Sequence, residues 1–272
     1  MPEGPEIRRA ADKIATALVG QVVEAVEFGL PRLSHHAEIL RGATVLDIET
    51  RGKALLTHFD NGHSIYSHNQ LYGRWWVVKR GNYPSTQRSL RMALHTSSHS
   101  ALLYSASEIE VLDAAGINSH AFLCKLGPDI LNGDLSWREI ARRLLAQRFR
   151  RRRLAALYLD QSFLAGVGNY LRSEILFAAG SNPWARPQEL ETKRVNRLAR
   201  STLLISQRAY QTAGITNPPQ RVSRLKQGGL PRSQFRHAVF GREDKPCYGC
   251  GETIRKDAIA ARRIYWCPLC QY

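Results

Sequence analysis

Four of the five cysteines lie close together near the C-terminus, and their spacing limits the fold more than any other feature. They form the pattern C-x2-C-x16-C-x2-C, which is typical of a site where four thiolates bind one zinc ion. A secreted disulfide framework would instead spread an even number of cysteines along the chain. Because four thiolates leave no open position for water or substrate, we predict one structural Zn²⁺. Its expected ligands are Cys247, Cys250, Cys267 and Cys270.

The charge of the chain indicates the kind of partner. The 272 residues include 39 Lys and Arg against 23 Asp and Glu, a formal charge of +16. An excess of this size favours a polyanion, with nucleic acid ahead of an anionic membrane. No apolar run approaches the length of a membrane-spanning helix, and the N-terminal segment lacks the pattern of a signal peptide. We therefore expect a cytoplasmic monomer that binds nucleic acid and no membrane.

The N-terminal part reads as one helix followed by a β domain. Apolar residues at helical spacing predict a helix over 5–18, and Gly20 follows as a stop signal. Asn61-Gly62 is a cue for a type I′ hairpin turn. Short strands without intervening helices predict a β-sandwich or barrel, ending near Cys124, which we interpret as a packed thiol. The expected strands cover 22–28, 44–50, 53–59, 64–68, 75–79, 90–96 and 101–106.

The apolar period becomes helical beyond this domain. Ser136 and Glu139 form a capping-box pattern, and helices are expected over 153–165, 169–180 and 189–214. A stretch rich in Pro, Gly, Gln and basic residues then predicts a flexible loop. The expected segments are a β domain over 1–124, a helical DNA-binding domain over 125–214, a flexible loop over 215–237 and a zinc finger over 238–272.

The first residues, "MPEGPEI", contain a candidate nucleophile. A helix start explains Gly4, Pro5 and Glu6 but leaves Pro2 and Glu3 unexplained. Removal of the initiator methionine makes Pro2 a terminal secondary amine, and an α-amino group titrates around pH 8. Attack of such an amine on a sugar aldehyde carbon gives an iminium, the Schiff-base form of covalent catalysis. The neighbouring Glu3 is suited to moving the accompanying proton.

Three further motifs fit nucleic-acid binding, and each also has a plain structural explanation. "HNQLYG" is either an edge strand entering a turn or a wedge inserted into a duplex. "GVGN" joins two helices and is either an ordinary helix cap or an anion site. The run "RFRRRR" and the basic zinc hairpin are either solvated or face phosphates.

Together and in this order, the motifs resemble the bacterial formamidopyrimidine-DNA glycosylase/endonuclease VIII repair enzymes over nearly the whole chain. "PEGPEI", "RGKALLTHF", "DQSFLAGVGNYLRSEIL" and "ARRIYWCPLCQ" carry the resemblance. "SHNQLYG" and "RIYWCPLCQ" are closer to the branch that acts on oxidised pyrimidines. The resemblance implies a two-domain α+β fold, with an N-terminal β-sandwich and flanking helix, a helix–two-turn–helix bundle and a zinc-finger hairpin.

The resemblance also implies roles for catalytic residues. Pro2 is expected to attack C1′ of the damaged nucleotide, and Glu3 to donate a proton in base release and sugar-ring opening. Lys53 is expected to contact phosphate and to donate a proton in β-elimination. Arg262 matches the residue assigned to δ-elimination by its spacing from Cys267, with Arg263 as its possible substitute.

The implied DNA contacts come from other motifs. Asn169 is expected to hold backbone phosphate beside the lesion, and Lys125 to make a basic DNA contact. Gln70, Leu71 and Tyr72 are expected to fill the space left by the flipped nucleotide.

The implied function is a base-excision-repair glycosylase and AP lyase for double-stranded DNA that contains an oxidised pyrimidine or an abasic site. It proceeds through a Schiff base with β,δ-elimination. Two alternatives remain open. One is the sibling glycosylase for oxidised purines, and the other is a non-catalytic zinc-ribbon DNA-binding protein.

Overall fold

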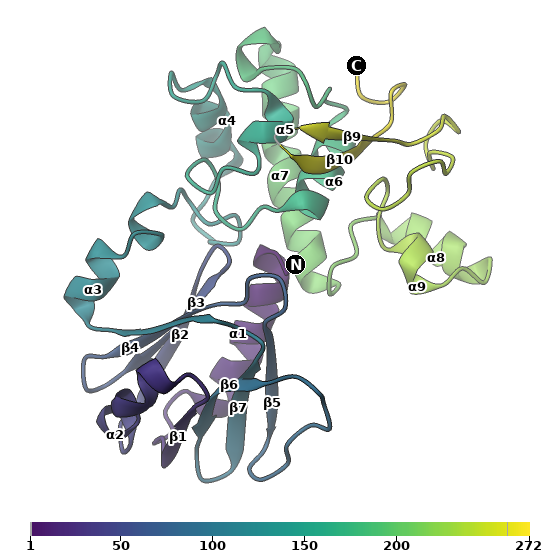
Figure 1. Ribbon diagram of the computed structural model, residues 1–272. Coiled ribbons are helices and arrows are strands. Elements are labelled where there is room, and N and C mark those ends of the chain that lie inside the picture. Colours follow the sequence, from purple (N-terminus) through teal and green to yellow (C-terminus); the bar gives the residue numbers. More distant parts are fainter. Residues whose placement is uncertain (1, 260) are drawn as a thin grey trace. The chain divides into compact units, whose positions relative to one another are not determined.

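The computed structural model describes residues 2–259 and 261–272, and these form two compact units (Figure 1). The first unit contains Pro2 and residues 6–125. The second contains residues 3–5 and 126–272. The chain therefore begins in the first unit, contributes three residues to the second and returns to the first within helix α1 (Gly4–Leu18).

The first unit is a β-sandwich with α1 beside it, as the sequence predicts. Two four-stranded antiparallel sheets have the orders β1-β6-β7-β5 and β2-β3-β4-β8. Apolar side chains from both sheets and from α1 form one buried core, which includes Ile14, Leu55 and Leu103. The strands are β1 (Ala25–Phe28), β2 (Val45–Arg51), β3 (Ala54–Phe59), β4 (Ser64–His68), β5 (Arg74–Lys79), β6 (Leu90–His95), β7 (His99–Tyr104) and β8 (Glu108–Leu112). Short helices are η1 (Pro31–His36), α2 (Ala37–Leu40), α3 (Ala114–Ser119) and η2 (Leu123–Lys125).

Three details of the first unit differ from the prediction. Strand β8 was not expected, although its alternation buries Ile109 and leaves the glutamates on either side only partly covered. The β3–β4 connection is longer than a type I′ turn, because Phe59 N donates to His63 O and, of the pair Asn61-Gly62, only the glycine has positive φ (+81°). Cys124 is exposed and not a packed thiol.

The second unit is mainly helical. Helix α7 packs against α4 and α6 (Figure 1). Their apolar faces share one core. The predicted cap of α4 is present, since Ser136 Oγ accepts from Glu139 N at 3.2 Å. The elements are α4 (Trp137–Leu145), α5 (Leu154–Leu157), α6 (Asn169–Ala179), η3 (Pro187–Glu189), α7 (Thr192–Gln211), α8 (Pro219–Gln227), α9 (Arg232–Phe235), β9 (Arg255–Ile259) and β10 (Arg262–Trp266).

The helix expected over 153–165 is shortened to α5. Beyond it, side chains take over the backbone donors that a longer helix would use. Ser162 N donates to Asp160 Oδ1 at 2.8 Å, and Gly166 N donates to Gln161 Oε1 at 3.1 Å. Such local bonds compete with helical ones and favour turns.

The segment 215–237 contains two short helices where the sequence predicts a loop. Pro219 is the first residue of α8, and Pro231 immediately precedes α9. Proline suits a helix start because the first N–H groups have no helical acceptor. At the other end of α8, Gly229 has φ +76° and Leu230 N donates to Leu225 O, as in a glycine-based helix stop. The prolines and glycines therefore mark helix ends here.

Candidate active site

The Glu3 carboxylate is bound at the N-terminal end of α6. Its Oε2 accepts from Gly168 N at 2.8 Å and from Leu171 N at 3.2 Å, and its Oε1 accepts from Tyr170 N at 2.9 Å. The first N–H groups of a helix have no partner within the helix, and Gly168, at the cap position, has no side chain to supply one. Glu3, which is only 3% exposed, thus serves as the cap. Of the two interpretations of "GVGN", a helix cap and an anion site, the structure combines both, because the cap is a carboxylate of the protein itself.

Glycines make this close approach feasible. A Cβ on Gly168 would lie 2.3 Å from Glu3 Cδ and 2.4 Å from its Oε1. Gly4 N donates to Gly166 O at 2.8 Å, and Gly166 has φ +97°, a conformation that side chains disfavour. A side chain at position 168 would therefore displace the glutamate, and one at position 166 would strain the segment that pairs with Gly4.

We expect Gly168→Ala to lower the free energy of unfolding by about 1–3 kcal/mol. The added methyl group forces the Glu3 side chain or the start of α6 to move, and the carboxylate then loses N–H donors. Gly133→Ala is the matched control, because a Cβ there meets nothing within 4 Å. Denaturant unfolding of both variants checks this, and equal stability of the two would contradict the close contact.

A buried arginine links this cap to the zinc-finger hairpin. Arg172, fully buried in α6, donates to Ala155 O at 2.8 Å and to Arg263 O at 2.6 Å, and it lies 3.4 Å from Asn169 Oδ1. The pKa of Arg172 is lowered to about 10, chiefly by burial; the Glu3 carboxylate raises it and the exposed Arg262 lowers it. Arg172 remains a cation near neutral pH. In the second unit, Glu3, Asn169 and the β10 arginines thus surround Arg172. None of the sequence motifs singles out Arg172.

Lys53 lies in the two-residue turn between β2 and β3. Gly52, with φ +66°, occupies the first position of this turn, where a type II′ turn requires positive φ. Burial lowers the pKa of the nearby His68, Glu108 raises it and the Lys53 ammonium lowers it. Lys53 therefore interacts electrostatically with His68, the last residue of β4.

Residues 69–73 form a tight loop with an apolar tip. Gly73 N donates to Asn69 O at 2.7 Å, and Asn69 Nδ2 donates to Gly73 O at 3.2 Å. At the tip, Leu71 is 50% exposed and Tyr72 is 66% exposed. Exposing two large side chains on an anchored loop is what a wedge requires.

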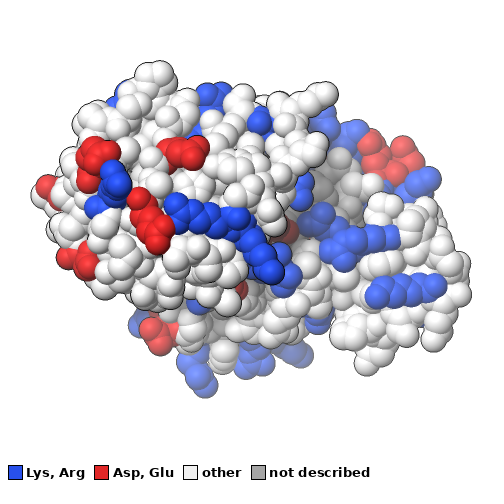
Figure 2. Space-filling model, turned by 90° about the horizontal axis from the view of Figure 1, so that it is seen from below, with Lys and Arg blue, Asp and Glu red and all other residues white. Residues whose placement is uncertain are grey.

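The predicted site residues divide between the two units. Pro2, which is half-buried, and the exposed Lys125 at the end of η2 belong to the first unit with Lys53 and the 69–73 loop. Glu3, Asn169 and Arg262 belong to the second. Figure 2 shows Lys and Arg side chains spread over the displayed face, with Asp and Glu in a few separate groups.

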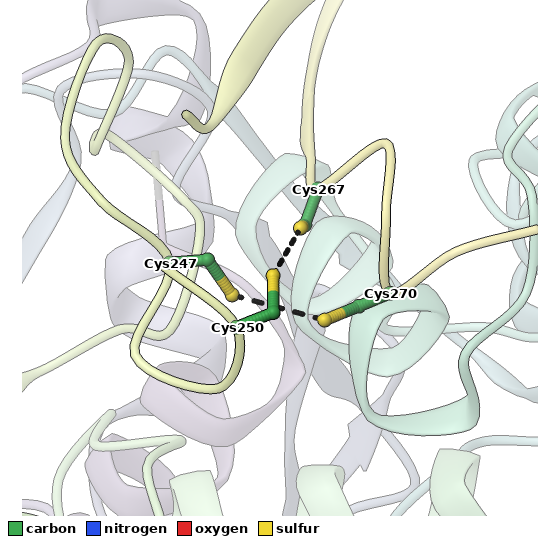
Figure 3. Close-up of side chains that lie close together, drawn as sticks. All are labelled: Cys247, Cys250, Cys267 and Cys270. Atoms are coloured by element: carbon green, nitrogen blue, oxygen red, sulfur yellow. Dashed lines mark hydrogen bonds between the residues drawn. The ribbon is translucent and has the colours of Figure 1, made fainter. Parts of the chain in front are cut away.

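The four predicted cysteine ligands converge on one point (Figure 3). Their sulfur atoms all lie within 4.8 Å of one another, at 3.9 Å for Cys247–Cys270 and 3.4 Å for Cys250–Cys267. Tetrahedral coordination at a Zn–S distance of about 2.3 Å separates sulfurs by about 3.8 Å. The cysteines are free thiols, so this cluster can hold a metal ion.

The chain resembles known DNA-repair proteins along its whole length. Residues 1–107 match the N-terminal domain of formamidopyrimidine-DNA glycosylase, and residues 126–218 match its H2TH domain. Endonuclease 8 of Escherichia coli O17:K52:H18 is 46% identical over 272 residues, and that of Salmonella arizonae is 45% identical over 271; each alignment covers 100% of both chains.

The fold is also that of a solved structure. Lactococcus lactis Fpg in complex with DNA containing an abasic site has a TM-score of 0.80, with 21% identity over 99% of each chain. Among the described residues, no helix is long and apolar enough to cross a membrane.

Proposed function

This chain belongs to the formamidopyrimidine-DNA glycosylase and endonuclease 8 family and is a bifunctional DNA glycosylase and AP lyase, and from that premise we propose that it removes oxidised pyrimidines from double-stranded DNA. The lesion class is supported by the full-length similarity to proteins named endonuclease 8. For the mechanism, the observation with most weight is the fixed Glu3 carboxylate, which directly follows Pro2 in the chain.

Pro2 is the nucleophile in this proposal. Its terminal nitrogen forms a bond to C1′ while the glycosidic bond breaks, and the base leaves with the bonding electrons and a proton from Glu3. The Glu3 carboxylate then takes the proton from the positively charged Pro2 nitrogen and passes it to the ring oxygen, so that the sugar opens and the nitrogen–carbon bond becomes an iminium. Covalent catalysis of this kind divides one difficult displacement into easier steps.

The iminium then makes the 2′ proton acidic. Loss of this proton expels the 3′ phosphate, with Lys53 supplying a proton in β-elimination. A second elimination, assigned to Arg262, expels the 5′ phosphate. Hydrolysis of the Schiff base frees Pro2, and the product is a one-nucleotide gap with phosphate on both sides.

DNA binding is assigned to the remaining predicted residues. Extruding a base costs a few kcal/mol, and contacts to phosphates together with a wedge offset that cost. Asn169 and Lys125 contact phosphates, and Gln70, Leu71 and Tyr72 occupy the vacated space. In this proposal the protein acts as a monomer, because one lesion presents one site, and it acts in the cytoplasm, where bacterial DNA lies.

A panel of duplexes tests the lesion class. We expect single-turnover excision of thymine glycol to be faster than excision of 8-oxoguanine by the same preparation. The reverse order would assign the protein to the oxidised-purine branch and leave the reaction chemistry unchanged. Activity on neither lesion, with binding to both, would favour the non-catalytic alternative.

We also propose that the metal is one structural Zn²⁺, because the sulfur spacing fits tetrahedral thiolate coordination. Bound zinc would keep all four thiols ionised, whereas burial and the neighbouring cysteines raise the pKa of Cys267 and Cys270.

Cys250→Ser is expected to reduce the zinc content from one ion per chain and to weaken DNA binding at least about tenfold, because the β9–β10 hairpin loses its anchor. Cys250 is itself exposed, so the exposed Cys124 provides a matched control in Cys124→Ser. Metal analysis and DNA titration at fixed salt measure both effects. Full zinc content in the Cys250 variant would contradict the four-cysteine site.

A further inference from the structure

Both polar ends of the Gln70 side chain are hydrogen-bonded to the segment where β8 begins. Its Nε2 donates to Glu108 Oε2 at 3.0 Å, and its Oε1 accepts from Ser107 Oγ at 2.8 Å. The Gln70 backbone has φ +50°, a left-handed conformation that is uncommon for residues other than glycine. Gln70 is exposed, but the hydrogen bonds of its Nε2 and Oε1 and its left-handed backbone conformation fix the direction of its side chain.

Glu108 is in turn fixed from the opposite side. Its Oε1 accepts from the hydroxyl of Tyr66 at 2.9 Å, and Tyr66 is fully buried. Burial and the neighbouring Glu108 raise the pKa of Tyr66 above its ordinary value, so the hydroxyl keeps the proton that it donates. One carboxylate thus connects a rigid residue of the sheet to a residue of the exposed loop.

His68 completes this network at the backbone. Its Nδ1 accepts from Gln70 N at 3.1 Å and lies 3.7 Å from Glu108 Oε2. Burial lowers the pKa of His68, so the ring is neutral near pH 7 and Nδ1 can accept this bond. The ring also packs edge-on against Phe122, which limits its movement.

We propose that Glu108 is a positioning residue for Gln70, and that its carboxylate, fixed by Tyr66, aims the Gln70 side chain before the loop enters DNA. This inference rests on the proposed role of Gln70 in filling the vacated base stack. Preorganising a group that must be ordered in the complex lowers the entropy lost on binding. Glu108 therefore acts through Gln70 and needs no contact with the lesion.

The test follows base extrusion in a thymine-glycol duplex that carries 2-aminopurine opposite the lesion. Glu108→Ala is expected to slow the fluorescence change about tenfold, the typical effect of losing a hydrogen bond to a charged group. Glu108→Gln, which keeps a carbonyl acceptor, is expected to be intermediate. Glu110→Ala is the matched control, since it removes the same charge from the same strand.

Two further measurements separate positioning from general damage to the fold. Borohydride trapping on a single-stranded abasic site needs no stack to be filled, so Glu108→Ala should trap at the wild-type rate. In the Gln70→Ala background, Glu108→Ala should add no further defect in the duplex assay. Additive effects, slow trapping on the single strand, or a Glu108→Ala variant equal to Glu110→Ala would overturn the inference.

A different result would contradict the proposed role of Gln70 itself. If Gln70→Ala alone extrudes the base at the wild-type rate, Gln70 is not a wedge residue and the inference falls with that role. If Gln70→Ala is slow and Glu108→Ala is not, only the positioning role of Glu108 is lost.

Discussion

Glu3→Gln is expected to slow base excision by about 10²–10⁴-fold, the usual contribution of a positioned acid or base. An amide keeps the size of the side chain but cannot supply the proton that opens the sugar ring. It also has one acceptor oxygen in place of two, whereas the carboxylate accepts from Gly168, Tyr170 and Leu171 with both oxygens. At least one of these N–H groups then faces an amide NH₂, at a cost of about 1–3 kcal/mol in stability.

Single-turnover excision of thymine glycol and thermal unfolding should be measured on the same Glu3→Gln preparation. If chemistry is the main loss, the rate falls far more than the fraction of folded protein does. Glu38→Gln makes the same chemical change on a side chain that is 82% exposed and should match the wild type. An excision rate within about threefold of the wild type, well below the range for an acid–base residue, would remove Glu3 from the mechanism.

Blocking the N-terminus is expected to abolish the borohydride-trapped adduct. A tag that precedes Pro2 places its nitrogen in an amide bond, which has no basic lone pair for attack on C1′. Proteolytic removal of the tag, leaving Pro2 as the first residue, should restore trapping on an abasic duplex. Pro2→Gly keeps a terminal amine but makes it primary, so sharply reduced trapping is expected.

The tagged protein and the protein after tag removal are compared because they differ in whether the Pro2 nitrogen is free. Both should bind the abasic duplex with similar affinity, which shows that folding and DNA binding survive the tag. Full trapping by the blocked protein would assign the Schiff base to another amine, and Lys53 would be the first candidate. Intact mass measurement of the untagged protein should show that the initiator methionine is absent.

Local patterns in the sequence were sufficient for several parts of the structure. The cysteine spacing brought four sulfurs together as predicted, because each C-x2-C pair fixes two ligands within one short turn. The Ser136 cap of α4 and the apolar face of α1 were also read correctly, since both depend on residues within a few positions. Short strands separated by turns predict a β-sandwich or barrel, and the two separate sheets show that it is the sandwich.

Contacts between distant residues could not be read in this way. The bond from Gly168 to Glu3 joins residues 165 positions apart, and no periodic pattern reports it. Arg172 is a basic residue in a largely apolar helix, and no local pattern predicts that it binds the carbonyl of Arg263. The prolines and glycines around α8 and α9 predict a loop, because composition alone does not separate a helix end from a loop.

The position of Glu3 also has a consequence for the order in which the protein is made. Its three partners lie at residues 168–171, so they leave the ribosome about 10–30 s after Glu3 at about 5–20 residues per second. During that interval the nascent chain contains Pro2, the proposed nucleophile, but not the N–H groups that hold the Glu3 carboxylate. A product of interrupted translation that ends before α6 lacks these donors altogether, so the Glu3 carboxylate can be held in this way only in a chain that extends beyond Leu171.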